Sequence, residues 1–230
     1  MLIVLEGVDS SGKATQTALL SEHLAKSQEI MQVTFPDYES DSSALVKMYL
    51  SGVFGEDADA VSPYSASVFY AADRYASYKT KWGSFLKEGG TVVCDRYTTS
   101  NMVHQAAKID SENEKDVFLD WLYDFEYNKM GLPVPDLVFF LDMPPHYARL
   151  LMESRKNKFT GEADKDIHER DKAHLEKAYN NAVYVAKKNN WKFISCIKDG
   201  KIRTIEDIHS EIVGITEGII HEFSAHFTGR

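Results

Sequence analysis

The chain has 230 residues, of which 43% are apolar, so it is long enough to bury a substantial core. Its formal net charge of −9 at pH 7 argues against a general nucleic-acid or membrane-surface binder, because both of those partners are anionic. The apolar run at residues 1–5 is too short for a signal peptide or a membrane span. These properties predict a soluble, cytoplasmic protein in which Cys94 and Cys196, which form no CxxC pair, are buried free thiols.

Five short apolar runs alternate with segments that are long enough to form helices. The runs are rich in β-branched or aromatic residues and cover residues 2–5, 31–35, 91–94, 137–141 and 193–197. Their nearly continuous apolar character predicts strands buried on both faces of a parallel sheet, joined by crossover helices. No linker or internal repeat interrupts this alternation. We therefore expect a five-stranded α/β sandwich that forms a single domain over residues 1–230.

Boundary signals predict two of the helices in more detail. One begins at Ser62, an N-cap followed by Pro63, and runs to about Glu88. The other covers residues 114–130 and ends before Gly131. Its apolar residues at helical spacing are Val117, Trp121, Leu122 and Phe125. The tail at residues 202–230 is expected to form an amphipathic closing helix.

A phosphate-binding motif follows the first predicted strand. Residues 7–13 read Gly-Val-Asp-Ser-Ser-Gly-Lys and match the body of the P-loop pattern GxxxxGK[ST]. Glycines allow the loop to turn its backbone N–H groups inward, and the N-terminus of the following helix adds positive potential. Lys13 would reach the β- and γ-phosphates of ATP. The predicted ATP-binding residues are Gly7, Val8, Asp9, Ser10, Ser11, Gly12, Lys13, Ala14 and Thr15.

The last position of the motif departs from the pattern. Ala14 stands where a Ser or Thr hydroxyl normally contacts Mg²⁺, and Thr15 would point elsewhere on the helix. Asp95, at the end of the third strand, is the predicted metal ligand, because the carboxyl ends of parallel strands surround the ligand crevice. Phosphate oxygens and water would complete the Mg²⁺ site.

Beyond the P-loop, the sequence resembles the thymidylate kinase family of P-loop nucleoside-monophosphate kinases. The family pattern appears in order over residues 1 to about 185: an acidic P-loop residue, Phe-Pro after the second strand, an aromatic-x-x-[DN]-R helix, Asp-Arg-Tyr after the third strand, and Gly-Leu-Pro and Pro-Asp-Leu before the fourth. In this chain these pieces are Asp9, Phe35-Pro36, Tyr70 to Arg74, Asp95-Arg96-Tyr97, Gly131-Leu132-Pro133 and Pro135-Asp136-Leu137.

The resemblance implies a three-layer α/β/α sandwich with a lid at about residues 155–172. It also implies a homodimeric enzyme that transfers the γ-phosphoryl group of ATP to dTMP in dTTP biosynthesis. Arg74 and Arg96 would clamp the acceptor phosphate, Tyr70 would stack on thymine, and Asp9 would accept a hydrogen bond from the 3′-hydroxyl. The remaining implied dTMP-binding residues are Phe35, Ser100, Asn101 and Gln105. The implied catalytic residues are Lys13, Asp95, Arg96 and Arg155.

Three departures from the family pattern affect the expected mechanism or substrate contacts. Ser10 and Ser11 are neutral where some relatives carry a basic P-loop residue, so the missing charge should come from the lid. Arg155 is the leading candidate for that charge, and Lys156 and Lys158 follow it; a solvated helical hairpin is the alternative interpretation of this segment. The sequence Asp37-Tyr38-Glu39 stands where relatives often have an arginine that contacts the acceptor phosphate, and His168 replaces a tyrosine of some bacterial relatives near the sugar.

Two other functions are compatible with a P-loop in this setting. The chain could phosphorylate a different nucleoside monophosphate, or it could bind nucleotides as a regulator without turnover. A panel of nucleoside monophosphates distinguishes the first alternative from a dTMP kinase, and an ATP-consumption assay with dTMP distinguishes the second.

Overall fold

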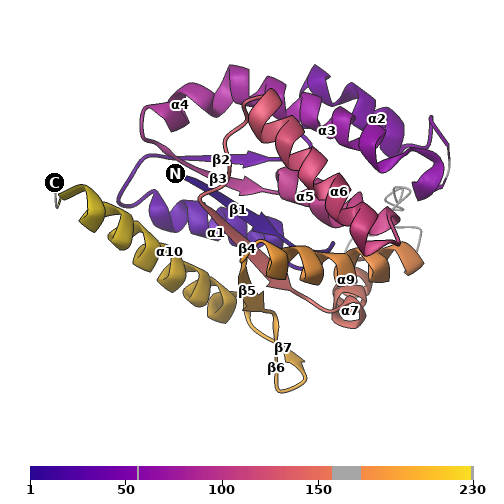
Figure 1. Ribbon diagram of the computed structural model, residues 1–230. Coiled ribbons are helices and arrows are strands. Elements are labelled where there is room, and N and C mark those ends of the chain that lie inside the picture. The colour runs from indigo at the N-terminus through magenta and orange to yellow at the C-terminus, as the bar shows by residue number, and fades with distance from the viewer. Residues whose placement is uncertain (56, 157–171, 229–230) are drawn as a thin grey trace.

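The computed structural model describes residues 1–55, 57–156 and 172–228 (Figure 1). Its centre is a five-stranded, all-parallel sheet in the order β2-β3-β1-β4-β5. The strands are β1 (Leu2–Glu6), β2 (Ile30–Thr34), β3 (Thr91–Asp95), β4 (Leu137–Asp142) and β5 (Lys192–Ser195). Each strand overlaps one of the five apolar runs to within one or two residues, so the predicted α/β fold with a five-stranded parallel sheet is confirmed.

The position of each strand in the sheet explains how deeply it is buried. The three inner strands β3, β1 and β4 are buried along almost their whole length, because helices cover both of their faces. The edge strands β2 and β5 are partly exposed. The expectation that all five strands are buried on both faces was therefore wrong for these two, since an edge strand has a neighbour on one side only.

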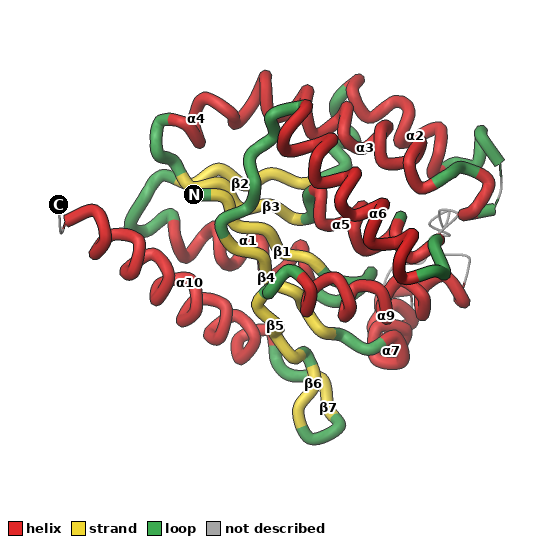
Figure 2. The backbone as a smooth tube through the Cα atoms, viewed as in Figure 1, coloured by secondary structure: helices red, strands yellow, loops and turns green. Residues whose placement is uncertain are grey.

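Two layers of helices cover the sheet, and alternate residues of β1 point into separate cores. Leu2 and Val4 belong to one core, and Ile3 and Leu5 to the other. Helices α1, α7 and α10 contribute to the second core. Figure 2 shows helices on both sides of the strands, as expected for three layers. The bounds are α1 (Lys13–Leu24), α2 (Ala44–Leu50), α3 (Pro63–Ser77), α4 (Gly83–Lys87), α5 (Thr98–His104), α6 (Glu112–Tyr123), α7 (Pro145–Lys156), α9 (Lys172–Lys188) and α10 (Ile205–Thr228).

The two helices with predicted boundaries are present, and each contains a π-helical turn. Ser62 caps α3 by accepting a hydrogen bond from the Ser65 backbone N–H, and η3 (Tyr78–Trp82) joins α3 to α4. Helix α6 begins slightly before its predicted start and continues as η5 (Asp124–Lys129). Val117 is 57% exposed rather than packed in the core. The buried face of α6 instead carries Phe118 and Leu122, four residues apart.

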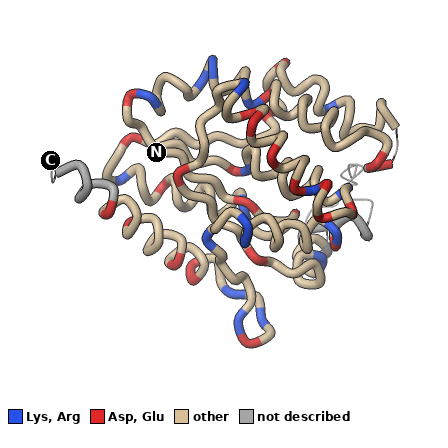
Figure 3. Tube along the Cα trace, in the orientation of Figure 1, with Lys and Arg blue, Asp and Glu red and all other residues tan. Residues whose placement is uncertain are grey.

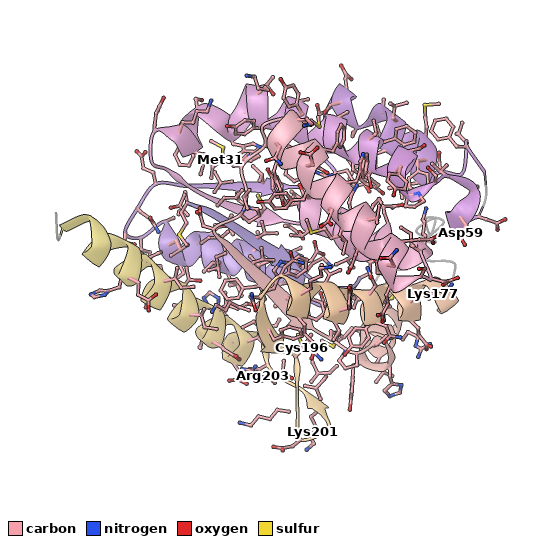
Figure 4. The ribbon with its side chains drawn as sticks, viewed as in Figure 1. Met31, Asp59, Lys177, Cys196, Lys201 and Arg203 are labelled. Atoms are coloured by element: carbon pink, nitrogen blue, oxygen red, sulfur yellow. The ribbon has the colours of Figure 1, made fainter. Side chains whose placement is uncertain are left out.

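The C-terminal part of the chain contains a feature that the sequence did not predict. After β5, a small antiparallel hairpin forms from β6 (Ile197–Lys198) and β7 (Lys201–Ile202), so Ile197 does not extend β5. Figure 4 shows Lys201 on this hairpin and Arg203 at its base. Helix α10 follows and packs on α1, where the Gln16 side chain donates to the backbone carbonyl of Ile205 at 2.9 Å. The predicted closing helix is therefore present.

Charge is distributed over many elements of the fold. Figure 3 shows Asp and Glu on several helices, including α10, and Lys and Arg at the hairpin. Within residues 1–55, 57–156 and 172–228, no helix combines the length and the apolar character that a membrane span requires. Both cysteines are buried free thiols, as expected.

Candidate active site

The P-loop connects β1 to α1 and has the close packing that its glycines require. A Cβ atom on Gly7 would lie 2.7 Å from Ser11 Oγ and 3.0 Å from the backbone oxygen of Leu141. Gly12 directly precedes α1 with φ 94°, a conformation that L side chains rarely adopt. The loop therefore turns sharply into the helix, and α1 begins at Lys13.

Lys13 and Asp95 lie together beside this loop. The Lys13 ammonium donates to the backbone carbonyls of Gly7 at 2.7 Å and Val8 at 2.8 Å. Burial, together with the nearby Arg96 cation, lowers the pKa of Lys13 to about 8, although neighbouring carboxylates oppose the shift. Burial likewise raises the pKa of Asp95, although Lys13 and Arg96 favour its charged form. A small cavity is lined here by Ser10, Gly12, Lys13, Ala14, Thr15, Asp95 and Arg96.

A second cavity of about 240 Å³ contains every residue that the sequence predicted for dTMP binding. It is lined by Asp9, Phe35, Tyr70, Arg74, Arg96, Ser100, Asn101 and Gln105. The structure adds five further lining residues, Pro36, Tyr38, Leu50, Tyr97 and His104. Segments from β1, β2, α3 and α5 thus converge on one cavity, and Arg96 lines both this cavity and the one beside the P-loop.

Arg96 has a constrained position between the two cavities. Its backbone φ of 67° is unusual for a residue with a side chain, and its N–H donates to the Leu5 carbonyl at 3.2 Å. Its guanidinium pairs with the P-loop carboxylate of Asp9 and contacts His104 Nε2 at 3.1 Å. Although burial opposes the charge of Arg96, Asp9 and Glu6 raise its pKa above the usual range.

Arg74 lies deeper, in a different set of contacts. Its side chain is only 1% exposed, and it forms a bidentate pair with Glu126 through Nε at 2.7 Å and Nη2 at 2.5 Å. Burial opposes the charge, but Glu126 offsets this effect and raises the pKa of Arg74. The third nitrogen, Nη1, makes two long contacts of 3.4 Å, to the Tyr97 carbonyl and Asn101 Oδ1. Arg74 is therefore neither the surface ion pair nor the isolated cation that a sequence motif alone would allow.

Two buried amides complete the deep end of the larger cavity. Asn101 is 2% exposed and its Nδ2 has no hydrogen-bond partner, and Gln105 is 1% exposed with an unpartnered Oε1. Buried polar atoms are normally hydrogen-bonded, so unpartnered ones that line a cavity are available to a ligand or to water. The deep end of the cavity consequently offers both a donor and an acceptor.

The sequence interpretation missed two buried carboxylates. Glu6 ends β1 and accepts hydrogen bonds from Gly7 N–H at 2.9 Å, Thr99 Oγ1 at 2.8 Å and Ser100 Oγ at 2.7 Å. Glu126 could have been found from its spacing, because it continues the buried Phe118–Leu122 stripe by four residues. A buried carboxylate needs a charged or hydrogen-bonding partner. A Glu on the apolar face of a predicted helix is therefore a sequence signal for such a buried pair.

The donor set suits a metal ion that also binds phosphate oxygens. Within the described parts of the chain, no group of three or more His, Cys, Asp or Glu side chains is arranged to hold a metal ion. Asp95 Oδ1 is buried without a hydrogen-bond partner beside the P-loop, and Ala14 contributes no oxygen from its side chain. One hard carboxylate oxygen beside a phosphate site fits Mg²⁺, which is usually bound through one or two carboxylates and substrate phosphates.

The predicted lid at residues 155–172 falls mostly outside the described residues, which stop at Lys156 and resume at Lys172. Arg155 lies in the last turn of α7, and Lys158 and His168 are in the part that is not described. The two helices that flank this segment are linked by a 3.6 Å contact between Arg149 Nη2 of α7 and Glu176 Oε1 of α9. The helix that precedes the segment and the helix that follows it therefore contact each other.

Comparisons with known proteins agree with this geometry. A sequence model of the family described as "Thymidylate kinase" matches residues 5–212. A protein named thymidylate kinase from Plasmodium falciparum is 30% identical over 92% of this chain and 87% of its own length. One with the same name from Mycobacterium tuberculosis is 32% identical over 80% of this chain and 84% of its own, and a probable thymidylate kinase from Pyrococcus horikoshii is 31% identical over 94% and 95%.

Proposed function

The chain belongs to the thymidylate kinase family, and from this premise we propose that it transfers the γ-phosphoryl group of ATP to dTMP, giving ADP and dTDP. The observation that carries the proposal is the pair of neighbouring cavities. One adjoins the P-loop, and the other is lined by all eight residues predicted for dTMP. Arg96 lines both of them, so a donor and an acceptor phosphate can meet beside one guanidinium.

The deep end of the larger cavity supports recognition of thymine. Thymine presents carbonyl acceptors and one ring N–H donor, whereas cytosine carries an amino group in place of the O4 acceptor. Arg74 Nη1 and Asn101 Nδ2 are donors, and Gln105 Oε1 is an acceptor. These two donors and one acceptor complement the carbonyl groups and the ring N–H of thymine. The amino group of cytosine would instead face a donor, which disfavours its binding. Tyr70 lines the same cavity and provides an aromatic ring for stacking.

The two arginines support different tasks in this proposal. Arg96 contacts the P-loop through Asp9, so it is placed to hold the acceptor phosphate. Arg74 lines only the larger cavity and contacts Asn101, so we assign it to the base of the nucleotide. Of the two arginines predicted to bind the acceptor phosphate, only Arg96 keeps that role in our proposal. Asp9 keeps its proposed contact with the 3′-hydroxyl.

Transfer of a phosphoryl group depends on alignment and charge stabilisation more than on covalent chemistry by the protein. Lys13 would bind the β- and γ-phosphates of ATP, and Arg96 would align the dTMP phosphate for attack on the γ-phosphorus. Arg155 would add a cation from the lid, since the P-loop itself has only neutral Ser10 and Ser11 between Asp9 and Gly12. Asp95 would hold Mg²⁺, which neutralises phosphate charge when bound.

An exposed apolar surface on α3 and α6 supports the proposed homodimer. It consists of the exposed Tyr64, Val68, Tyr75 and Val117, with the half-buried Trp121 beside them; Val68 is 43% and Val117 57% exposed. The rings of Tyr64 and Trp121 contact each other at 4.7 Å, which makes the two helices one continuous surface. Apolar patches of this kind mark interaction sites, and a second copy using the same surface would bury both.

A coupled assay across dTMP, dUMP, dCMP, AMP and GMP tests the function. We expect the highest kcat/KM for dTMP, and a much lower value for dCMP because its amino group faces donors. A higher kcat/KM for AMP or GMP would show that the chain phosphorylates another nucleoside monophosphate. Binding of ATP without consumption in the presence of dTMP would indicate a regulator without turnover.

A further inference from the structure

Glu126, like Glu6, is a fully buried carboxylate next to the larger cavity, and it does not line that cavity. Its side chain is 0% exposed. It accepts hydrogen bonds from Arg74 Nε at 2.7 Å, from Arg74 Nη2 at 2.5 Å and from Thr98 Oγ1 at 2.7 Å. These bonds join η5, which carries Glu126, to α3 and to the first residue of α5.

Arg74 lines the larger cavity, and one of its nitrogens, Nη1, makes only long contacts with the protein. Glu126 occupies Nε and Nη2 in a bidentate arrangement, which fixes the plane of the guanidinium. Nη1 makes two contacts, to the Tyr97 carbonyl and to Asn101 Oδ1, and both are 3.4 Å long, a distance too long for a strong hydrogen bond. Arg74 can therefore donate a well-directed hydrogen bond from Nη1 to a ligand atom while its charge is balanced from behind.

Stability alone is a poor explanation for this pair. Buried ion pairs lose much of their Coulombic attraction to desolvation, and apolar replacements are often equally stable. The π-helical turn η5 also carries Glu126 at the continuation of an otherwise apolar face. A costly charged residue at such a position is better explained by the orientation that it imposes on its partner.

We propose that Glu126 is a positioning residue for substrate recognition: with support from Thr98, it holds the Arg74 guanidinium so that Nη1 donates to the base of the acceptor nucleotide. This inference rests on the proposed function, because it concerns the base end of the same cavity. Glu126 itself touches no substrate in this arrangement and acts only through Arg74.

The test measures equilibrium binding of dTMP, together with KM for dTMP, KM for ATP and kcat, in Glu126→Gln. The amide keeps the shape but turns one acceptor into a donor that opposes Arg74. We expect dTMP binding to weaken about 10- to 100-fold, the range of one charge-assisted hydrogen bond. KM for ATP should stay constant, kcat at saturating dTMP should change little, and the preference for dTMP over dCMP should narrow. Glu114→Gln, on the exposed first turn of α6, is the matched control and should leave all values unchanged.

A double-mutant cycle separates positioning from a general structural role. Arg74→Lys removes the planar fork, so adding Glu126→Gln to it should weaken dTMP binding no further. If the two changes were instead additive in dTMP binding, Glu126 would not act through Arg74. Thr98→Val, which removes one donor to Glu126 at nearly constant volume, provides a milder variant if Glu126→Gln does not fold. It should weaken dTMP binding by about threefold, within the net effect of one hydrogen bond.

The outcomes distinguish this inference from the function on which it rests. If the unmodified protein did not phosphorylate dTMP, the proposed function would be wrong. If it did, and folded Glu126→Gln and Thr98→Val both bound dTMP as tightly as the unmodified protein, only the positioning role of Glu126 would be wrong.

Discussion

Lys13 has a pKa lowered to about 8, because burial disfavours its ammonium and the Arg96 cation adds to this effect. The side chain therefore loses its proton as the pH rises through about 8, whereas an ordinary lysine stays charged to about 10.5. We expect kcat/KM for ATP, which at saturating dTMP reports on the enzyme before ATP binds, to fall above pH 8. We expect kcat to fall at a higher pH than kcat/KM, because the bound phosphates of ATP stabilise the charged form of Lys13. Measuring both parameters against pH at saturating dTMP tests this.

Lys108 is the control for this profile, because burial lowers its pKa to about 8 as well. Its ammonium donates to Tyr49 Oη and the Val61 carbonyl, away from the P-loop. Lys108→Arg, which stays charged, should therefore retain the alkaline fall in kcat/KM. A profile that remained level up to pH 10.5 would contradict the lowered pKa of Lys13.

Asp95→Asn should lower activity without lowering stability. Burial raises the folded-state pKa of Asp95 above its usual 3.8, so its negative charge destabilises the fold at pH values above 3.8. An amide of the same shape removes that charge, and the melting temperature should stay constant or rise. Loss of the proposed metal ligand should lower kcat/KM at limiting Mg²⁺ by at least the roughly 10- to 100-fold that outer-shell partners of a metal contribute. Ala14→Ser, at an exposed position, should retain full activity.

The matched control is Asp142→Asn, at the end of another inner strand, β4, which lies on the other side of β1. Asp142 accepts a hydrogen bond from Tyr179 Oη and does not line the cavity beside the P-loop. Its replacement should leave the Mg²⁺ dependence unchanged. Near-full activity of folded Asp95→Asn at limiting Mg²⁺ would remove Asp95 from the metal site.

At the scale of elements, helices α7 and α9 flank the predicted lid. Arg149 and Glu176 join these two helices, so the predicted lid lies between two helices that contact each other. A mobile cation placed over transferring phosphates is worth about 10³-fold or more in kcat. Arg155→Ala should therefore lower kcat steeply while dTMP affinity stays nearly unchanged, because Arg74 and Arg96 bind the acceptor. Steady-state kinetics with both substrates varied will measure the two effects separately.

Lys177→Ala provides the control for the lid. Lys177 lies on α9 and pairs with Asp110 at 3.1 Å, at an exposed position. Its removal should leave kcat constant. If kcat stayed within about twofold even in a triple replacement of Arg155, Lys156 and Lys158, a 10³-fold contribution from the lid would be ruled out and the solvated hairpin would be favoured.

At the scale of the whole molecule, the surface on α3 and α6 determines the expected assembly. Val68→Glu together with Val117→Glu places charges in the apolar surface. In an isologous dimer both copies contribute this surface, so the interface would contain each new charge twice. We expect this variant to sediment as a monomer in analytical ultracentrifugation, whereas the unmodified chain should sediment as a dimer. Val134→Glu is the control, because Val134 is 49% exposed and belongs to neither helix. A dimer that persisted in the double variant would place the interface elsewhere.

The amino-acid sequence alone was sufficient to predict the features that depend on local patterns. The five strands follow from short β-branched runs, and the P-loop from a strand, a glycine-containing turn and a helix that adjoin one another in the chain. Ser62 and Pro63 likewise begin α3 by contacts within one turn. All eight residues predicted for dTMP line one cavity, since the family pattern already relates segments that the chain itself keeps apart.

Only the tertiary structure decided the contacts between distant segments. The order β2-β3-β1-β4-β5 makes β2 and β5 edges, which their apolar composition did not reveal. Arg74 and Glu126 are 52 residues apart, and they meet only because α3, α5 and η5 pack against one another. The same packing sends Arg74 to the deep end of the cavity and leaves Arg96 beside the P-loop, although both belong to similar short motifs. Burial and partner choice depend on which elements become neighbours, and a local sequence pattern does not contain that information.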